Sequence, residues 1–300
     1  MKIEKYYGIN RELAQKMIDA TKDMAHKKTG DNKFQKTRVF LFAEYAILRM
    51  QNMNYRNVTT EDMDLKHLER LAVTLLDLQA KGVNVVPILA FQSDNGNGYI
   101  IQPRAKGAEL YDRDRMTDKD YVLHRVESLS KAPQEHFDKF VADTIQLIGA
   151  GVIVDFVGKD NFFYDEIIGF QFIDLNAHDD YEYGLSDDKP DAKQVASYGC
   201  FVPCYYDTVP QYRDTVSKVM MELTDRERII LKTQNKSVFE KCKSALINNG
   251  ISEEAVSGIL SEERFISQMR KWELNSIIKT HEITLYGSTV VSSRHSFFIC

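Results

Sequence analysis

The chain has 300 residues, of which 43% are hydrophobic and 28% charged, with a formal net charge of −5. Such a composition excludes intrinsic disorder, and the absence of a long basic run argues against a dedicated nucleic-acid-binding protein. No apolar stretch approaches the roughly 20 residues that cross a bilayer, and the N-terminus lacks the apolar core of a signal peptide. We therefore expect a cytoplasmic protein with no nucleic-acid or membrane partner, organised as about two domains or as two lobes.

The N-terminal part is predicted to be helical. Asn10 can cap a helix in which Met17 and Met24 belong to an apolar pattern near the helical period. Residues 1–36 are therefore interpreted as an N-terminal helical extension.

The next segment is predicted to form a small antiparallel sheet that carries one main helix. Its predicted elements are two strands within 37–50 that turn at Ala43–Glu44, a helix from 59–61 to Gly82, a strand over 83–91, a turn over 93–98 and a strand over 99–102. The strands are rich in β-branched and aromatic residues, whereas the helix has leucines at helical spacing. We assign residues 37–105 to a small lobe.

The remaining residues, 106–300, are predicted to form a larger and mostly helical lobe. An amphipathic helix ends at Gly149, and short strands then follow at 152–154, 161–164 and 170–173. The last two of these strands form a hairpin, and helices resume from about residue 210. The predicted fold class is therefore α+β with two lobes.

Three oxygen-bearing side chains are predicted to lie at one end of this hairpin. Asp155 follows an apolar strand, Asn161 begins the next strand, and Asp174 follows the one after. Pairing of the hairpin strands places Asn161 beside Asp174, and the loop that holds Asp155 enters at the same end. Such oxygens suit Mg²⁺, and a further carboxylate can accept a proton from an attacking hydroxyl. Asp and Asn also favour turns, so a purely local role is the alternative.

The order of these elements, together with the motif Phe-Ile-Asp174-Leu, resembles the protein-kinase-like superfamily. It is closest in style to the small-molecule branch, the aminoglycoside and choline phosphotransferases, and the resemblance covers roughly residues 37–180. It implies a two-lobed fold that binds ATP between the lobes, with Asp155 as the catalytic aspartate and with Asn161 and Asp174 as Mg²⁺ ligands. The segment that begins Gln102-Pro-Arg104 resembles the connection that binds adenine, which implies nucleotide contacts for both residues.

The sequence departs from the family's pattern at several positions. Ile153 stands where the family usually has His, and Asn161 lies one position later than usual, so that Asp160 is an alternative ligand. No glycine-rich phosphate loop is present. In the strand that usually carries a phosphate-binding lysine, Arg49 is the candidate, with Glu69 as its ion-pair partner. Read individually, Arg49 is more often an exposed strand cation, and Glu69 is more often a solvated helix residue.

The function that the resemblance implies is an ATP- and Mg²⁺-dependent phosphotransferase that moves the γ-phosphoryl group to a hydroxyl. The acidic segment 176–191 favours a cationic small molecule or protein as acceptor, and a solvated acidic loop is an equal alternative. Because of the departures, a catalytically inactive kinase-like module that binds nucleotide or protein stays open, as does an adenylyl-transferring relative.

The remaining polar candidates carry weaker signals. Cys200 and Cys204 lack a second pair of ligands, so ordinary thiols are favoured over a zinc site. His124 and His136 fit polar helix faces and are assigned no role. Neither the acceptor nor the oligomeric state can be read from the sequence.

Overall fold

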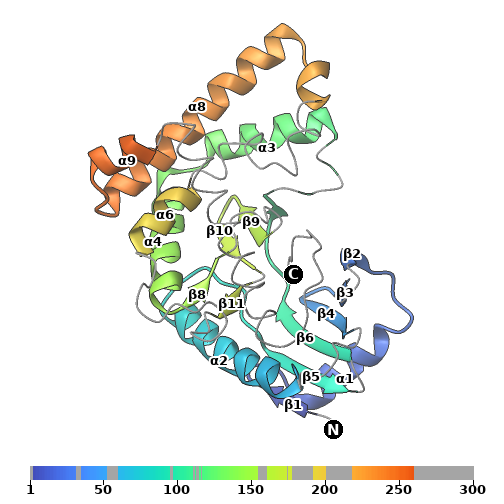
Figure 1. Ribbon diagram of the computed structural model, residues 1–300. Coiled ribbons are helices and arrows are strands. Elements are labelled where there is room, and N and C mark those ends of the chain that lie inside the picture. Colours follow the sequence, from blue (N-terminus) through green and yellow to red (C-terminus); the bar gives the residue numbers. More distant parts are fainter. Residues whose placement is uncertain are drawn as a thin grey trace, which may run out of the picture. The chain divides into compact units, whose positions relative to one another are not determined.

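The structure is a computed structural model of the 300-residue chain. It describes residues 3–31, 35–52, 60–94, 97–110, 112, 115, 117–154, 161–173, 175–177, 192–200 and 218–259. The chain divides into two compact units, of which the first reaches Ala105 and the second begins at Lys106 (Figure 1). The first unit is an antiparallel sheet with helices and the second is mostly helical, so the predicted two-lobed α+β class is confirmed.

The first unit is built on one six-stranded sheet, in which every pair of neighbouring strands is antiparallel. Its strands are β1 (Ile3–Tyr6), β2 (Lys27–Asp31), β3 (Gln35–Leu41), β4 (Tyr45–Asn52), β5 (Ala90–Asp94) and β6 (Asn97–Pro103). The order across the sheet is β1-β5-β6-β4-β3-β2. The predicted turn at Ala43–Glu44 does join β3 to β4, and it is closed by a 2.8 Å hydrogen bond from the Phe42 N–H to the Tyr45 carbonyl.

The N-terminal segment belongs to this sheet and is not a separate helical extension. The predicted helix is present as α1 (Arg11–Ala20), and Asn10 caps it by accepting a 2.8 Å hydrogen bond from the Leu13 N–H. However, β1 pairs with β5 at one edge of the sheet and β2 pairs with β3 near the other. Four residues are too few to show a clear alternation in the sequence, so only the pairing with β5 identifies β1 as a strand.

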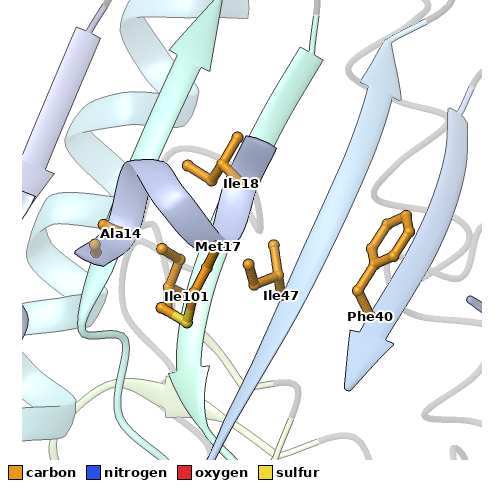
Figure 2. Close-up of a cluster of buried hydrophobic side chains, with 7 residues drawn as sticks. Ala14, Met17, Ile18, Phe40, Ile47 and Ile101 are labelled. Carbon is orange, nitrogen blue, oxygen red and sulfur yellow. The ribbon is translucent and has the colours of Figure 1, made fainter. Parts of the chain in front are cut away.

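The helix α1 covers one face of the sheet, where one cluster of buried hydrophobic side chains lies. Three α1 side chains pack with residues from four strands, and Figure 2 shows them with Phe40, Ile47 and Ile101. The buried members of this cluster are Ala14, Met17, Ile18, Phe40, Ile47, Ala90 and Ile101.

The main helix and the strand that follows it are only partly as predicted. The helix α2 (Thr60–Ala80) is confirmed, and Gly82 follows it with a φ of 89°. The predicted strand over 83–91 is wrong at its start, because β5 begins only at Ala90. Residues such as Val83, Val85 and Ile88 are buried without forming a ladder, and Pro87 has no N–H to donate to one. Burial alone therefore explains this apolar run.

The second unit combines helices with two small sheets. The helices are α3 (Lys119–Lys131), α4 (Gln134–Gly149), α6 (Ala192–Cys200), α8 (Asp225–Asn248) and α9 (Glu253–Ile259). The strands are β7 (Ala108–Glu109), β8 (Val152–Ile153), β9 (Phe162–Asp165), β10 (Gly169–Phe172) and β11 (Asn176–Ala177), ordered β10-β9-β7 and β11-β8. The predicted helix that ends at Gly149 and the predicted hairpin are thus confirmed, whereas the helix expected around Trp272 lies outside the described residues.

Aromatic side chains hold the hairpin on α4. The Phe140 ring stacks on Phe172 with centroids 5.2 Å apart, and it meets Phe170 at 4.9 Å and Phe162 at 5.8 Å. All four rings are buried, so this cluster is the core beneath β9 and β10. Among the described residues, none of the helices combines the length and the apolar composition that a membrane span requires.

The close approach of Gly107 to β9 generates a stability prediction. Gly107 has a φ of 77°, and a Cβ at this position would overlap the backbone carbonyl of Tyr164. We expect Gly107→Ala to lower the free energy of unfolding by more than about 2 kcal/mol, since strained backbone and a steric clash add. Gly250→Ala is the matched control, because its φ is 80° but its nearest neighbour is the flexible Lys193 ammonium. It should cost only about 1 kcal/mol in urea unfolding, and equal losses would contradict the close approach.

The N-terminus of α8 generates a pH prediction. The Thr224 N–H donates to Glu227 Oε2 at 2.7 Å, and Lys119 of α3 lies 2.9 Å from Oε1. The Lys119 hydrogen bond, followed by those from Thr224, lowers the pKa of Glu227 from 4.5 to about 2. The stabilisation is therefore complete above the ordinary carboxyl pKa and is lost as the pH falls towards 2.

We expect Glu227→Gln to lower the melting temperature at pH 7 and to have a diminishing effect as the pH approaches 2. Glutamine can still bond the cap residue but carries no charge, so the substitution isolates the ionised carboxylate. Thermal unfolding of both proteins across this pH range measures the difference. A difference that does not change with pH would contradict an ionic contribution.

Candidate functional site

The described part of the predicted site is the open end of the β9–β10 hairpin. Asn161 lies directly before β9, and Ile173 lies directly after β10. The Ile173 N–H donates a 3.0 Å hydrogen bond to the Asn161 carbonyl, which continues the register that pairs Phe162 with Phe172. The hairpin therefore brings Asn161 beside the residue that precedes Asp174 in the sequence. Asp174 itself lies outside the described residues.

A second backbone pairing joins the segment before Asp155 to the segment after Asp174. Ile153 of β8 pairs with Asn176 of β11. Ile153 lies two residues before Asp155, and Asn176 lies two residues after Asp174. Backbone pairing thus connects residues that lie next to or near each of the three predicted site residues in the sequence. Asp155 and the alternative ligand Asp160 themselves fall outside the described residues.

The donor set predicted from the sequence fits a hard cation. Within the part of the chain that the structure describes, no three His, Cys, Asp or Glu side chains converge to hold a metal. Asn161 is the described member of the predicted set, and an amide oxygen is a donor that Mg²⁺ accepts. With the carboxylates of Asp155 and Asp174, the set has the all-oxygen composition of a magnesium site.

Tyr164 and His136 anchor the hairpin to α4. The Tyr164 hydroxyl lies 3.2 Å from His136 Nδ1, and both residues are buried. Burial, reinforced by the charge of Glu166, raises the pKa of Tyr164 to about 12, so the hydroxyl stays protonated and can donate to the ring. Gly169, with a φ of 80°, leaves room for the same imidazole. The sequence interpretation of His136 as a residue of a polar helix face is therefore wrong, because this α4 side chain is buried against Tyr164 and Gly169 of the hairpin.

In the first unit, the alternation of side chains along β4 decides where Arg49 lies. Ile47 belongs to the core beneath α1, and Arg49 lies two residues further along the same strand. Because successive side chains of a strand point to opposite faces, Arg49 shares the α1 face, whereas Ala46 and Leu48 lie on the other.

The helix α2 lies on that other face. Glu69 of α2 forms a 2.9 Å ion pair with Lys5 of β1. Lys5 precedes Tyr6, and Tyr6 packs against the α1 core, so Lys5 points to the face opposite α1. The hydrogen bond and the charge of Glu69 raise the pKa of Lys5, which keeps the ammonium charged.

The predicted ion pair between Arg49 and Glu69 is therefore not formed. Glu69 pairs with Lys5, and the Arg49 guanidinium lies over the Phe40 ring, 5.2 Å from its centroid. The sequence analysis located β4 correctly but did not identify which face of it α2 covers. Because side chains alternate along a strand, a shift of one residue moves a side chain to the opposite face. Lys5 was missed because a lysine in a short N-terminal segment belongs to no recognisable motif.

The two remaining predicted residues lie at the end of β6. Gln102 pairs with Ala46 and is half-buried on the α2 face, since its neighbour Ile101 is in the α1 core. Arg104 is exposed, and its N–H donates a 2.8 Å hydrogen bond to the Glu44 carbonyl. The nucleotide contacts of Gln102 and Arg104 therefore stay predictions.

Comparisons with known proteins find similarity only at the level of three-dimensional structure, as no family model and no curated protein matches the sequence. The pseudokinase domain of BIR2, an immune regulator of the RLK/Pelle family, is similar over 95% of this chain and 91% of its own, with a TM-score of 0.45 and 9% identity. A structure of WbdD is similar over 71% of this chain and 51% of its own, with a TM-score of 0.36 and 12% identity.

A structure of the bifunctional kinase-methyltransferase WbdD is similar over 67% of this chain and 47% of its own, with a TM-score of 0.33 and 14% identity. The chain thus spans about half the length of the WbdD structures. At these TM-scores the matches carry no statement about activity or ligands. Among the chain's own elements, the order expected from the sequence is present, with an antiparallel sheet that carries α2 and a hairpin that follows α4.

The pairing of Glu69 generates a prediction that separates the two possible partners. In a double-mutant cycle on unfolding free energy, Lys5→Met and Glu69→Gln should show a favourable coupling that weakens with added salt. Arg49→Met and Glu69→Gln should be additive, because the two side chains lie on opposite faces of the sheet. A coupling that involves Arg49 but not Lys5 would overturn the assignment of the faces.

Proposed function

We propose that the chain is a kinase-like phosphotransferase that uses ATP and Mg²⁺ and transfers the γ-phosphoryl group to an acceptor hydroxyl. The observation that supports this proposal best is the hydrogen bond from the Ile173 N–H to the Asn161 carbonyl. Together with the pairing of Ile153 with Asn176, it connects the segments in which Asp155, Asn161 and Asp174 occur.

The roles in this proposal follow from the chemistry of the three side chains. Asn161 and Asp174 hold Mg²⁺, which when bound neutralises charge on the phosphates of ATP. Asp155 orients the acceptor hydroxyl and accepts its proton. The acceptor oxygen forms a bond to the γ-phosphorus while the bond to the β,γ-bridging oxygen breaks, and ADP leaves. Gln102 and Arg104 are proposed to contact the nucleotide.

The proposed acceptor is a cationic small molecule or a cationic protein. The segment 176–191 is strongly acidic, and a field of one sign raises the local concentration of substrates of the opposite sign. An amino sugar or an amino alcohol has the required charge and hydroxyl, in keeping with the resemblance to the aminoglycoside and choline phosphotransferases. A cytoplasmic location, where ATP is abundant, is part of the same proposal.

A catalytically inactive kinase-like binding module is the second candidate, and one observation favours it. In the family, a strand lysine pairs with a helix glutamate and contacts the phosphates. Here the α2 face of β4 carries Ala46 and Leu48, and Glu69 is paired with Lys5. A nucleotide could still bind through the second unit, but the usual positive charge beside the phosphates would have to come from elsewhere.

The two candidates predict different results with labelled ATP. The purified full-length chain is incubated with Mg²⁺, γ- or α-labelled ATP, and an aminoglycoside, choline or a basic peptide. We expect transfer of the γ label, and a loss of about 10²- to 10⁴-fold in Asp155→Asn because the proton acceptor is removed. Asp174→Asn should also abolish transfer.

Asp77→Asn, at an exposed position of α2, is the matched control and should leave transfer unchanged. Transfer of the α label instead would indicate an adenylyl transferase. If no label is transferred but ATP raises the melting temperature of the wild type and not of Asp174→Asn, the binding module is supported. The absence of both transfer and stabilisation would contradict both candidates.

A further inference from the structure

The first residues of the second unit are built into the sheet that contains the hairpin. The unit begins at Lys106, and β7 follows and pairs with β9. The Leu110 N–H continues this pairing with a 2.6 Å hydrogen bond to the Phe162 carbonyl. The start of the second unit is therefore fixed through its backbone along β9, the strand that Asn161 precedes.

One side chain of the outer strand β10 reaches the same segment. Gln171 of β10 lies opposite Phe163 of β9, and Phe163 lies opposite Glu109 of β7, so the three residues form a row across the sheet. Gln171 Oε1 accepts a 2.6 Å hydrogen bond from the Lys106 N–H, three residues before Glu109. Because β9 lies between β10 and β7, this contact links two parts of the sheet that do not pair directly.

The geometry of this segment favours the contact, and the hairpin does not depend on it. Gly107 approaches the Tyr164 carbonyl too closely for any side chain, so the neighbouring Lys106 is kept near β9. Gln171 is half-buried and Lys106 is exposed, so water can bond the N–H if the Gln171 acceptor is removed. The hairpin itself is anchored on α4 through the Phe140 ring. Loss of the hydrogen bond should therefore loosen the segment around Lys106 without unfolding the second unit.

The two residues of this hydrogen bond are close in sequence to residues with proposed roles. Lys106 follows Arg104, a proposed nucleotide contact, by two positions, and Gln171 precedes Asp174, a proposed Mg²⁺ ligand, by three. Segments that bind one ligand together bind it more tightly when they are ordered beforehand, because binding then costs less conformational entropy. The Gln171 contact holds the chain after the first of these residues beside the strand that leads to the second.

We propose that Gln171 is a positioning residue for ATP binding. Its side-chain oxygen holds the Lys106 N–H, so the segment that follows Arg104 is ordered before the nucleotide binds. This role rests on the proposed phosphotransferase function, because it requires that Gln102 and Arg104 contact ATP. Gln171 is assigned no contact with the γ-phosphoryl group or with the acceptor. It therefore affects the affinity for ATP and not the rate of transfer.

Two substitutions in the full-length chain test this role. Gln171→Met keeps the length of the side chain but removes the acceptor, whereas Gln171→Glu keeps an accepting oxygen. In Gln171→Met we expect faster hydrogen exchange at the Lys106 amide of the ligand-free chain. The Kd for Mg²⁺·ATP from titration calorimetry and the KM for ATP should rise about 2- to 10-fold, the effect of one lost hydrogen bond. The kcat for transfer of the γ label should not change, and Gln171→Glu should restore the exchange rate, the Kd and the KM.

Gln146→Met, at an exposed position of α4, is the matched control and should change none of these values. The positioning role is overturned if Gln171→Met keeps the wild-type exchange rate at Lys106 or the wild-type affinity for ATP, or if it lowers kcat instead. It is also overturned if Gln171→Glu behaves like Gln171→Met, or if Gln146→Met has the same effect.

These results are distinct from a failure of the proposed function. If the wild type transfers the γ label and Gln171→Met binds ATP like the wild type, only the role of Gln171 is overturned. If the wild type binds ATP without transferring the label, the dissociation constants alone decide that role. A wild type that neither binds ATP nor transfers its label overturns both.

Discussion

The first unit depends on the pairing of β4 with strands on both sides. Backbone hydrogen bonds to β3 and to β6 run along the whole strand, so its side chains have to alternate between the two faces of the sheet. Ile47 is thereby fixed in the core beneath α1, and Arg49 must share its face. Leu48 is directed to the face that α2 covers. This one constraint separates Arg49 from Glu69, whatever the rest of the chain does.

The edge strand β1 supplies Glu69 with a different cation in place of Arg49. It pairs with β5 at the edge of the sheet and carries Lys5 on the α2 face, where the ammonium reaches Glu69. The carboxylate of Glu69, which the sequence analysis paired with Arg49 on a central strand, is thus paired with an edge strand. Both side chains are about half exposed, so the pair orients α2 more than it stabilises the unit.

In the second unit, side-chain packing and a backbone hydrogen bond hold the open end of the β9–β10 hairpin. Two sets of contacts fix the hairpin on α4, namely those of the Phe140 ring and the contact between His136 and Tyr164. The ends of β9 and β10 are therefore held next to one another. The hydrogen bond between Ile173 and Asn161 lies at those ends. The proposed Mg²⁺ site needs few protein ligands in a fixed arrangement, and a short hairpin anchored on a helix suits that need.

The sequence by itself determined the elements whose signals are local. Asn10 marks the start of α1, Gly82 follows the end of α2, and the spacing of apolar residues around Asn161 indicates the hairpin. Caps, turns and periodicity act over a few residues, so they can be read along the chain. The metal-ligand chemistry of Asp155, Asn161 and Asp174 was likewise proposed from side-chain types and their order.

Only the tertiary structure decided which faces and partners these elements have. The strand β1, the late start of β5 and the burial of His136 all result from contacts between residues far apart in the sequence. The same holds for Arg49, since a strand pattern shows two faces but not which helix covers each. Glu69 could therefore be chosen as an ion-pair residue from the sequence, whereas its partner Lys5 was fixed by packing and strand pairing.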